Sequence, residues 1–159
     1  MLTSEIEHQI NTTGTAAPTA LLVHARIQTG PLDVEAHIRA VDSPSAGAVV
    51  SFTGQVRNHD GGRSVLALEY SAHPSAQQVL DRVASEIAAT HEGLRGIAVS
   101  HRIGPLHIGD VALCVAIAAE HRREAFAACA DLVEKVKHQL PVWKRQTFPG
   151  GRQEWVGCP

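Results

Sequence analysis

The sequence has few aromatic residues, little sulfur and no long apolar run. Aromatic side chains make up 4% of the 159 residues, and there is a single methionine. The three cysteines are odd in number and form no Cys-x-x-Cys pair, which excludes a disulfide framework and the usual cysteine-based zinc site. No apolar stretch approaches the roughly 20 residues of a membrane-spanning helix, and residues 1–11 lack the basic and apolar parts of a signal peptide. We therefore expect a cytoplasmic protein that has no membrane partner.

The charge balance excludes a further class of partner. The chain carries 14 Lys and Arg against 16 Asp and Glu, a net charge of −2. Bulk attraction to nucleic acid needs a basic surface, so no nucleic-acid partner is expected. Any site for an anion must be built locally from a few basic side chains. The length suits one domain, residues 20–159, after a polar tail over residues 1–19 that we expect to be flexible.

Two common kinds of catalytic site are also missing. No G-x-S-x-G or equivalent nucleophile turn is present, which argues against a hydrolase. His101, His107 and His121 lack the i, i+4 spacing of helical zinc ligands, and we interpret them as surface or strand-end residues. No metal site is predicted.

Hydrophobic periodicity predicts an α+β fold in the order β-α-β-β-α-β-β-α-β-β, with helices packed on a mixed sheet. Asp33 is placed to cap the first helix, and Pro141 to end the third. The expected strands cover residues 19–27, 47–57, 65–70, 97–103, 111–118, 143–148 and 154–156. The expected helices cover residues 33–41, 75–93 and 121–140. On the second strand, one face is predicted to carry Ala48, Val50, Phe52 and Val56.

Basic residues open the third helix. His121, Arg122 and Arg123 fall in its first turn, where the helix dipole is positive and favours anions over cations. A phosphate or carboxylate bound there would explain them. The alternative is a solvated charge run beside Glu120 and Glu124.

Lys137 lies at the edge of the apolar stripe of the same helix. The stripe consists of Ala125, Phe126, Cys129, Leu132, Val133, Val136 and Leu140. At about 100° per residue, Lys135 and His138 fall toward the opposite, solvent-facing side. Lys137 either extends its ammonium group into water or lines a cleft.

Four segments together resemble the family of the large, catalytic subunit of molybdopterin synthase. They are GAVVSFTGQVRNHDGG (47–62), HRIGPLHIGD (101–110), EHRREAF (120–126) and KHQLPVWKRQ (137–146). The resemblance runs from Gly47 to Val156. The combination of G-x-V-R-N, H-R, and a lysine seven residues before the lysine of W-K-R carries its specificity.

The resemblance implies an α/β-hammerhead fold with a small additional antiparallel β subdomain. It further implies a homodimer that binds a small ubiquitin-like sulfur-carrier subunit at each end, giving a heterotetramer. The carrier's C-terminal Gly-Gly, as a thiocarboxylate, would deliver two sulfurs in turn to cyclic pyranopterin monophosphate to form the dithiolene of molybdopterin. No metal or other cofactor is implied.

Carried over by position, the family's pocket residues are Gln55, Val56, Arg57, His121, Arg122, Lys137, Lys144, Arg145 and Gln146. The resemblance makes Lys137 and Lys144 the catalytic pair, suited to proton transfer and charge stabilisation. Arg57, His121 and Arg122 suit the phosphate and polar pterin edge of the substrate.

Two positions depart from the family pattern. Gln146 stands where the family usually has an acid, and Gln55 where it often has lysine. A non-catalytic, partner-binding copy of the same fold is the alternative reading. Retention of both Lys137 and Lys144 argues against it, because an inactive copy would be free to lose them.

Overall fold

The computed structural model describes residues 21–157 of the chain. The expected tail over residues 1–19 lies outside the described residues, as does Cys158.

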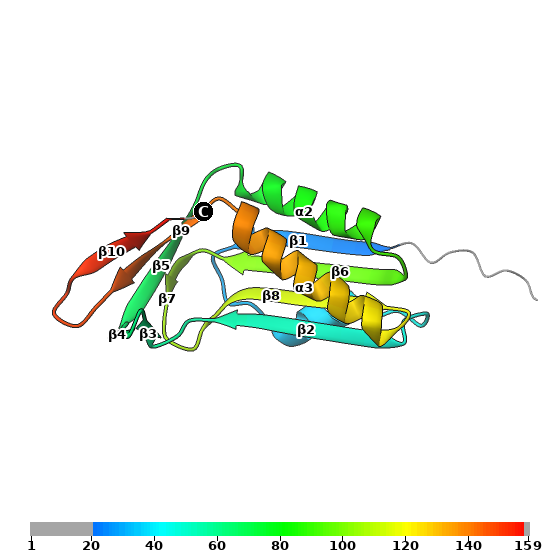
Figure 1. The fold of residues 1–159 in the computed structure, drawn as a ribbon, viewed down its shortest axis with the longest axis horizontal. Helices are drawn as coiled ribbons and strands as arrows, with labels where there is room; N and C mark the ends of the chain where they lie inside the picture. The colour runs from blue at the N-terminus through cyan, green and yellow to red at the C-terminus, as the bar shows by residue number, and fades with distance from the viewer. Residues whose placement is uncertain (1–20, 158–159) are drawn as a thin grey trace, which may run out of the picture.

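Of the two four-stranded sheets, the one with the longer strands has the order β1-β6-β8-β2 (Figure 1). Its strands are β1 (Leu22–Gln28), β2 (Ala48–Gln55), β6 (Leu94–Arg102) and β8 (Val111–Ala119). Strands β1 and β6 are parallel and the other pairs antiparallel, so the sheet is mixed, as expected. The central strands β6 and β8 are almost wholly buried, because their near-continuous apolar runs face packed layers on both sides.

Three helices cover the two faces of this sheet. Helices α2 (Ala76–Thr90) and α3 (Arg122–Gln139) lie on one face, and the short α1 (Val34–Ala40) on the other (Figure 1). The main core lies under α2 and α3. A smaller cluster under α1 joins Val41 to the small side chains Ala98, Ala116 and Ala118.

The helix ends follow from the sequence signals. Asp33 caps α1, with its Oδ1 accepting from the backbone N–H of Ala36 at 3.0 Å. Helix α3 starts after His121, which is its N-cap residue. It ends at Gln139, because the residue before Pro141 is forced into extended geometry.

The second sheet is an antiparallel subdomain beside the C-terminal end of α3, with the order β10-β9-β5-β7 (Figure 1). Its strands are β5 (Ala67–Ala72), β7 (Gly104–Leu106), β9 (Val142–Thr147) and β10 (Gln153–Val156). A hairpin of β3 (His59–Asp60) and β4 (Arg63–Ser64) adjoins it. The whole is the expected α/β-hammerhead with a small antiparallel β subdomain.

Three short strands were not expected. Strands β3 and β4 lie within the predicted loop 57–64, and β7 begins at a predicted turn. The reversal itself is as predicted, since Gly61 and Gly62 have φ of 55° and 76°.

The expected face of the second strand was wrong at Val56. The register of β2 shifts between Gly54 and Gln55, which ends the alternation begun by Val50 and Phe52. Val56 therefore packs in the core of the subdomain, with Leu68, Leu106 and Ala112.

Candidate active site

A cavity of about 250 Å³ lies between the C-terminal end of α3 and the antiparallel subdomain. Three of the predicted site residues line it: Gln55, Lys137 and Lys144. Tyr70 and His101 line it as well. The walls are otherwise apolar or backbone, formed by Gly54, Ala112, Leu113, Val136, Leu140, Val142, Val156 and Gly157.

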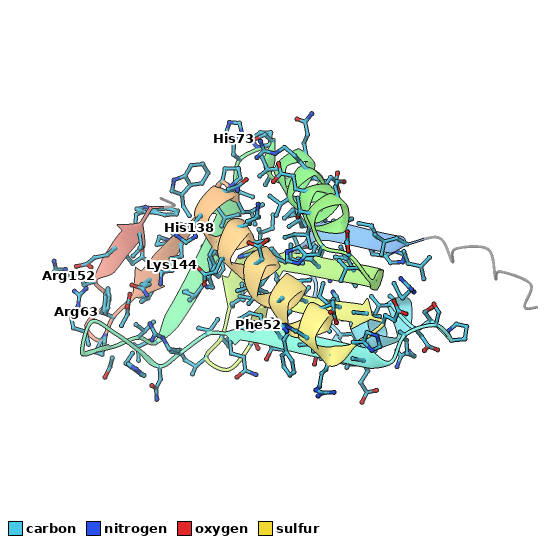
Figure 2. All side chains as sticks on the ribbon, turned by 45° about the vertical axis from the view of Figure 1, so that its right-hand side comes forward. Phe52, Arg63, His73, His138, Lys144 and Arg152 are labelled. Carbon is cyan, nitrogen blue, oxygen red and sulfur yellow. The ribbon has the colours of Figure 1, made fainter. Side chains whose placement is uncertain are left out.

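The chain reversal at Pro141 brings the two lysines to this cavity. Lys137 lies in the last turn of α3, and β9 starts at Val142, directly after the helix-ending proline. Strand β9 then runs antiparallel to β5, with Lys144 opposite Tyr70. Figure 2 shows Lys144 on the subdomain next to the end of α3. The two cations therefore converge although they come from different layers.

A carboxylate missed by the sequence reasoning stands beside Lys144. Asp60, on β3, accepts a hydrogen bond from Gln146 Nε2 at 2.9 Å, and its Oδ2 lies 3.7 Å from Lys144 Nζ. Its Oδ1 lies 3.6 Å from Arg57. The hydrogen bond from Gln146 and then the charge of Lys144 hold the pKa of Asp60 below its usual value. The sequence marked Asp60 only as a turn residue before two glycines.

The interpretation of His101 as a surface or strand-end residue is right about the strand end and wrong about the surface. It is the penultimate residue of β6, and its side chain is buried against the ring of Tyr70, with 4.9 Å between the ring centroids. Its Nδ1 lies 2.8 Å from the carbonyl oxygen of Arg102, so Nδ1 carries the hydrogen and Nε2 is the acceptor. Burial lowers the pKa of His101 to about 4, and the nearby charge of Lys137 acts in the same direction. The ring is a neutral acceptor in a cationic cavity.

Two predicted residues point away from the cavity. Arg145 projects from the opposite face of β9, where its guanidinium pairs with Glu69 at 2.5 Å and lies over the ring of Trp155. Successive strand residues face opposite sides, so Arg145 cannot share the cavity with Lys144. The buried Val56 side chain likewise lines no part of it.

His121 and Arg122 lie at the far end of α3. Arg122 is the first helical residue, fifteen positions before Lys137, which places the two about 22 Å apart along the helix axis. The side chain of His121 makes no capping hydrogen bond. The predicted site is thus divided within one chain: the lysines at one end of α3, the helix-N-terminal cations at the other.

The helical-face argument needs correction for Lys135 and Phe126. Lys135 does not face open solvent, because α2 packs on that flank and Glu86 lies 3.8 Å from its Nζ. Lys137 is the more exposed of the two lysines and lies on the flank toward β2. Phe126, assigned to the buried stripe, is 63% exposed on that same flank.

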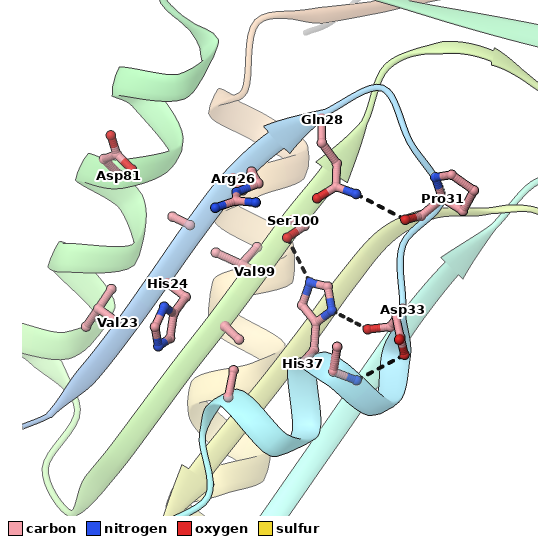
Figure 3. Close-up of a pocket in the computed structure, with 14 residues that line it drawn as sticks. Val23, His24, Arg26, Gln28, Pro31, Asp33, His37, Asp81, Val99 and Ser100 are labelled. Carbon is pink, nitrogen blue, oxygen red and sulfur yellow. Dashed lines mark hydrogen bonds between the residues drawn. The ribbon is translucent and has the colours of Figure 1, made fainter.

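A larger hollow of about 500 Å³ lies on the other face of the sheet, between β1 and α1 (Figure 3). There His37 Nδ1 lies 2.6 Å from the carbonyl oxygen of Asp33, and Nε2 lies 2.7 Å from Ser100 Oγ. The Ser100 hydroxyl therefore donates to the imidazole, as it would in a serine nucleophile. Ser100 is only 6% exposed, however, in a strand paired on both sides, whose N–H groups are used in the sheet. These bonds tie α1 to the sheet and do not form a hydrolytic site.

The sequence of the chain matches one known protein family. The family model described as MoaE protein matches residues 27–139. The chain belongs to the MoaE protein family. The molybdopterin synthase catalytic subunit of Nostoc sp. is 37% identical over 131 residues, 82% of this chain and 79% of the relative. Catalytic subunit 1 of Mycobacterium tuberculosis is 38% identical over 135 residues, 84% of this chain and 90% of the relative.

Solved structures of MoaE relatives share the fold. The crystal structure of molybdopterin synthase from Staphylococcus aureus superposes with a TM-score of 0.77 at 34% identity, covering 82% of this chain and 95% of that one. A complex of subunits 1 and 2 of molybdopterin-converting factor from Helicobacter pylori has a TM-score of 0.66 at 19% identity, covering 84% and 88%. The latter likeness is one of fold alone.

Residues 21–157 contain neither a metal-binding cluster nor a membrane-spanning helix. No group of three or more His, Cys, Asp or Glu side chains there is placed to hold a metal ion. The helices of this part of the chain also include none that could span a lipid bilayer.

Proposed function

We propose that this chain is the catalytic subunit of a molybdopterin synthase, acting in the cytoplasm. It transfers two sulfurs from the thiocarboxylated C-terminus of a small carrier subunit to cyclic pyranopterin monophosphate, forming the dithiolene of molybdopterin. The observation that carries the proposal is the convergence of Lys137 and Lys144 on one narrow cavity in a chain of the MoaE family.

The cavity suits a glycine tail that ends in an anion. Its walls combine polar and apolar groups and its volume is only about 250 Å³, so an extended segment without side chains fits where a bulkier one would not. The two ammonium groups are the partners that a thiocarboxylate needs once it leaves water. In a partly desolvated site they also stabilise the negative charge that develops as sulfur moves to the substrate.

The phosphate of the substrate needs further cations, and one chain supplies few of them at the cavity. Arg57 is held close by Asp60, whereas His121 and Arg122 lie about 22 Å along α3. A second copy of the chain, in a homodimer, can supply the missing pair. The carried-over residues then form one site from two subunits.

The flank of α3 that faces β2 is suited to this homodimer. Phe126 is exposed there, and a hollow of about 370 Å³ runs between α3 and the edge strand β2, past Val50, Phe52 and Val133. Figure 2 shows Phe52 beside α3. The midpoint between positions 122 and 137 falls at 129–130, next to this apolar patch. Two copies packed antiparallel there would bring Arg122 of one opposite Lys137 of the other.

The partner is a small ubiquitin-like carrier subunit, one for each catalytic subunit, giving a heterotetramer. The two-subunit complex from Helicobacter pylori, which shares the fold, supports such a pairing. A non-catalytic copy that only binds the carrier is not favoured, because such a copy has no need of two lysines in one cavity.

The test is single-turnover dithiolene formation with thiocarboxylated carrier and cyclic precursor. We expect Lys137→Ala to lower the rate on the order of 10²-fold or more. Lys135→Ala is the matched control on the same helix; its partly exposed ion pair with Glu86 is worth at most about 1 kcal/mol of stability, and its rate should stay near wild type.

Two outcomes would contradict the proposal. If wild-type protein binds the carrier but forms no product, the chain is a binding copy. If the Lys137→Ala and Lys135→Ala variants are equally active, the cavity lysine is not part of the reaction.

A further inference from the structure

We propose that Asp60 is a positioning residue, the carboxylate that holds Arg57 and the cavity residue Lys144 in place. The inference rests on the proposed function, since it gives a reason why these cations need a fixed place. It assigns a role to a hairpin residue that is not part of the cavity lining and reaches the site only through other side chains.

Three contacts converge on the two oxygens of this carboxylate. Oδ2 accepts from Gln146 Nε2 at 2.9 Å and lies 3.7 Å from Lys144 Nζ. Oδ1 lies 3.6 Å from the Arg57 guanidinium. The carboxylate and the ammonium are each about one-third exposed or less, at 32% and 27%. Partial burial of both groups makes the pairing stronger than an ordinary surface contact.

The fold presents Asp60 to one chosen face of β9. Residues two apart on a strand share a face, so Lys144 and Gln146 point the same way and Arg145 points the other way. The hairpin of β3 and β4 turns at Gly61 and Gly62 and lays Asp60 over that face.

Gln146 is the anchor of this arrangement. Its side chain is 3% exposed, and its orientation is determined, because a carboxylate only accepts and Nε2 must therefore face Asp60. Its Oε1 is buried without a hydrogen-bond partner among residues 21–157. The hydrogen bond to Asp60 is thus the one that fixes the orientation of this amide. The negative charge at this position thus comes from the hairpin, while β9 itself contributes a neutral donor.

Asp60 is also ionised near neutral pH. The hydrogen bond from Gln146 and the charge of Lys144 both lower its pKa. A carboxylate that remains charged is a fixed electrostatic reference for two long, flexible cations. Without it, Lys144 and Arg57 would sample many rotamers, and the geometry needed for sulfur transfer would be rare.

The test exchanges the charge between the hairpin and the strand. Asp60→Asn should lower single-turnover sulfur transfer about 10-fold or more. Gln146→Glu alone sets a second carboxylate against the first and should also be impaired. The double variant Asp60→Asn with Gln146→Glu restores one carboxylate and one amide in contact, with donor and acceptor reversed, and should return to within about 3-fold of wild type.

Asp110→Asn is the matched control. Asp110 is 31% exposed, pairs with Arg102 at 3.5 Å, and lies outside the cavity lining. It should lose as much thermal stability as Asp60→Asn and keep the wild-type rate. Full activity of Asp60→Asn, or a double variant no better than the single ones, would overturn the assignment.

A second measurement does not depend on turnover. Lysine acylation at limiting reagent, read by mass spectrometry, should show Lys144 several-fold more reactive in Asp60→Asn than in wild type, relative to Lys135, and restored in the double variant. If wild-type protein forms no product but this pattern holds, the proposed function fails and the positioning role stands. If the enzyme is active but the reactivity of Lys144 is the same in Asp60→Asn and wild type, the positioning role is wrong and the proposed function stands.

Discussion

His101 is a histidine that the fold keeps uncharged beside a lysine. The side chain is 7% exposed, and its Nδ1–H is committed to the Arg102 carbonyl. Protonating Nε2 would place a third cation in a cavity that already holds Lys137 and Lys144. The folded state therefore favours the neutral form of His101, and the stability of the protein depends on pH as a result.

We expect His101 to make the protein less stable in mild acid. The pKa of His101 is about 4 in the folded protein and about 6.5 in the unfolded chain, so between these values the unfolded state binds more protons. Its contribution is complete above pH 6.5 and is lost as the pH falls toward 4, by about 3 kcal/mol. Urea unfolding from pH 7 to pH 4 should show a shallower loss in His101→Asn, which keeps a donor for the Arg102 carbonyl.

The control for this experiment is His24→Asn, since that side chain is exposed on β1. Its pH dependence should match the wild type. An identical pH dependence in wild type and His101→Asn would show that His101 is protonated as readily in the folded state as in the unfolded one.

For single residues, the sequence predicts which side chains can take part in chemistry better than it predicts which other residues surround them. Lys137 and Lys144 were found from a motif, and both line the cavity. Asp60 and His101 were missed because their roles depend on contacts between segments far apart: Asp60 meets Gln146 across 86 positions. Arg145 was carried over with its neighbours, although strand alternation turns it to the other face.

At the scale of elements, the packing of α1 depends on one glycine. A Cβ atom at Gly96 would lie 2.7 Å from Val41 Cβ and 2.9 Å from its Cα, closer than real contacts allow. Val41 is fully buried and follows directly on α1, so it cannot move without lifting the helix from β6. Because Gly96 has no side chain, Val41 and α1 can pack closely against β6.

We expect Gly96→Ala to destabilise the protein by about 1–3 kcal/mol, the usual cost of overpacking a core. Gly30→Ala is the matched control, because a Cβ there meets nothing within 4 Å. The control should equal or slightly exceed wild-type stability, since alanine restricts the unfolded chain. Denaturant midpoints measure both, and equal midpoints would show that Val41 can shift freely.

Elements with strong end signals were predictable, and short ones were not. All three helices were found, because Asp33, Pro141 and the apolar stripes mark them. Strands of two or three residues, such as β3 and β7, are too short to show a period of two. The bulge after Gly54 also has no signature in the apolar pattern, and it moved Val56 from one core to another.

At the scale of the whole molecule, a nearly neutral chain must concentrate its positive charge. The net charge is −2, yet the proposed substrate and the carrier tail are both anionic. The cations proposed to meet them lie at opposite ends of α3, about 22 Å apart. A site assembled from two copies would resolve this conflict, because antiparallel packing over the exposed Phe126 would bring one end of α3 next to the other end of its partner's helix.

Mixing two inactive variants tests this arrangement. In Lys137→Ala the cavity lysine is lost but Arg122 remains, and in Arg122→Ala the reverse holds. If each site takes Lys137 from one subunit and Arg122 from the other, a mixed dimer contains one site with both residues and one with neither. Random exchange of equal amounts makes half of the dimers mixed, so about one quarter of wild-type activity should return, since complementation requires residues from both subunits. The separate homodimers, kept from exchanging, should remain at their low individual rates. Activity that stays at the average of the two variants after exchange would mean that each site draws both residues from one chain or that Arg122 serves elsewhere.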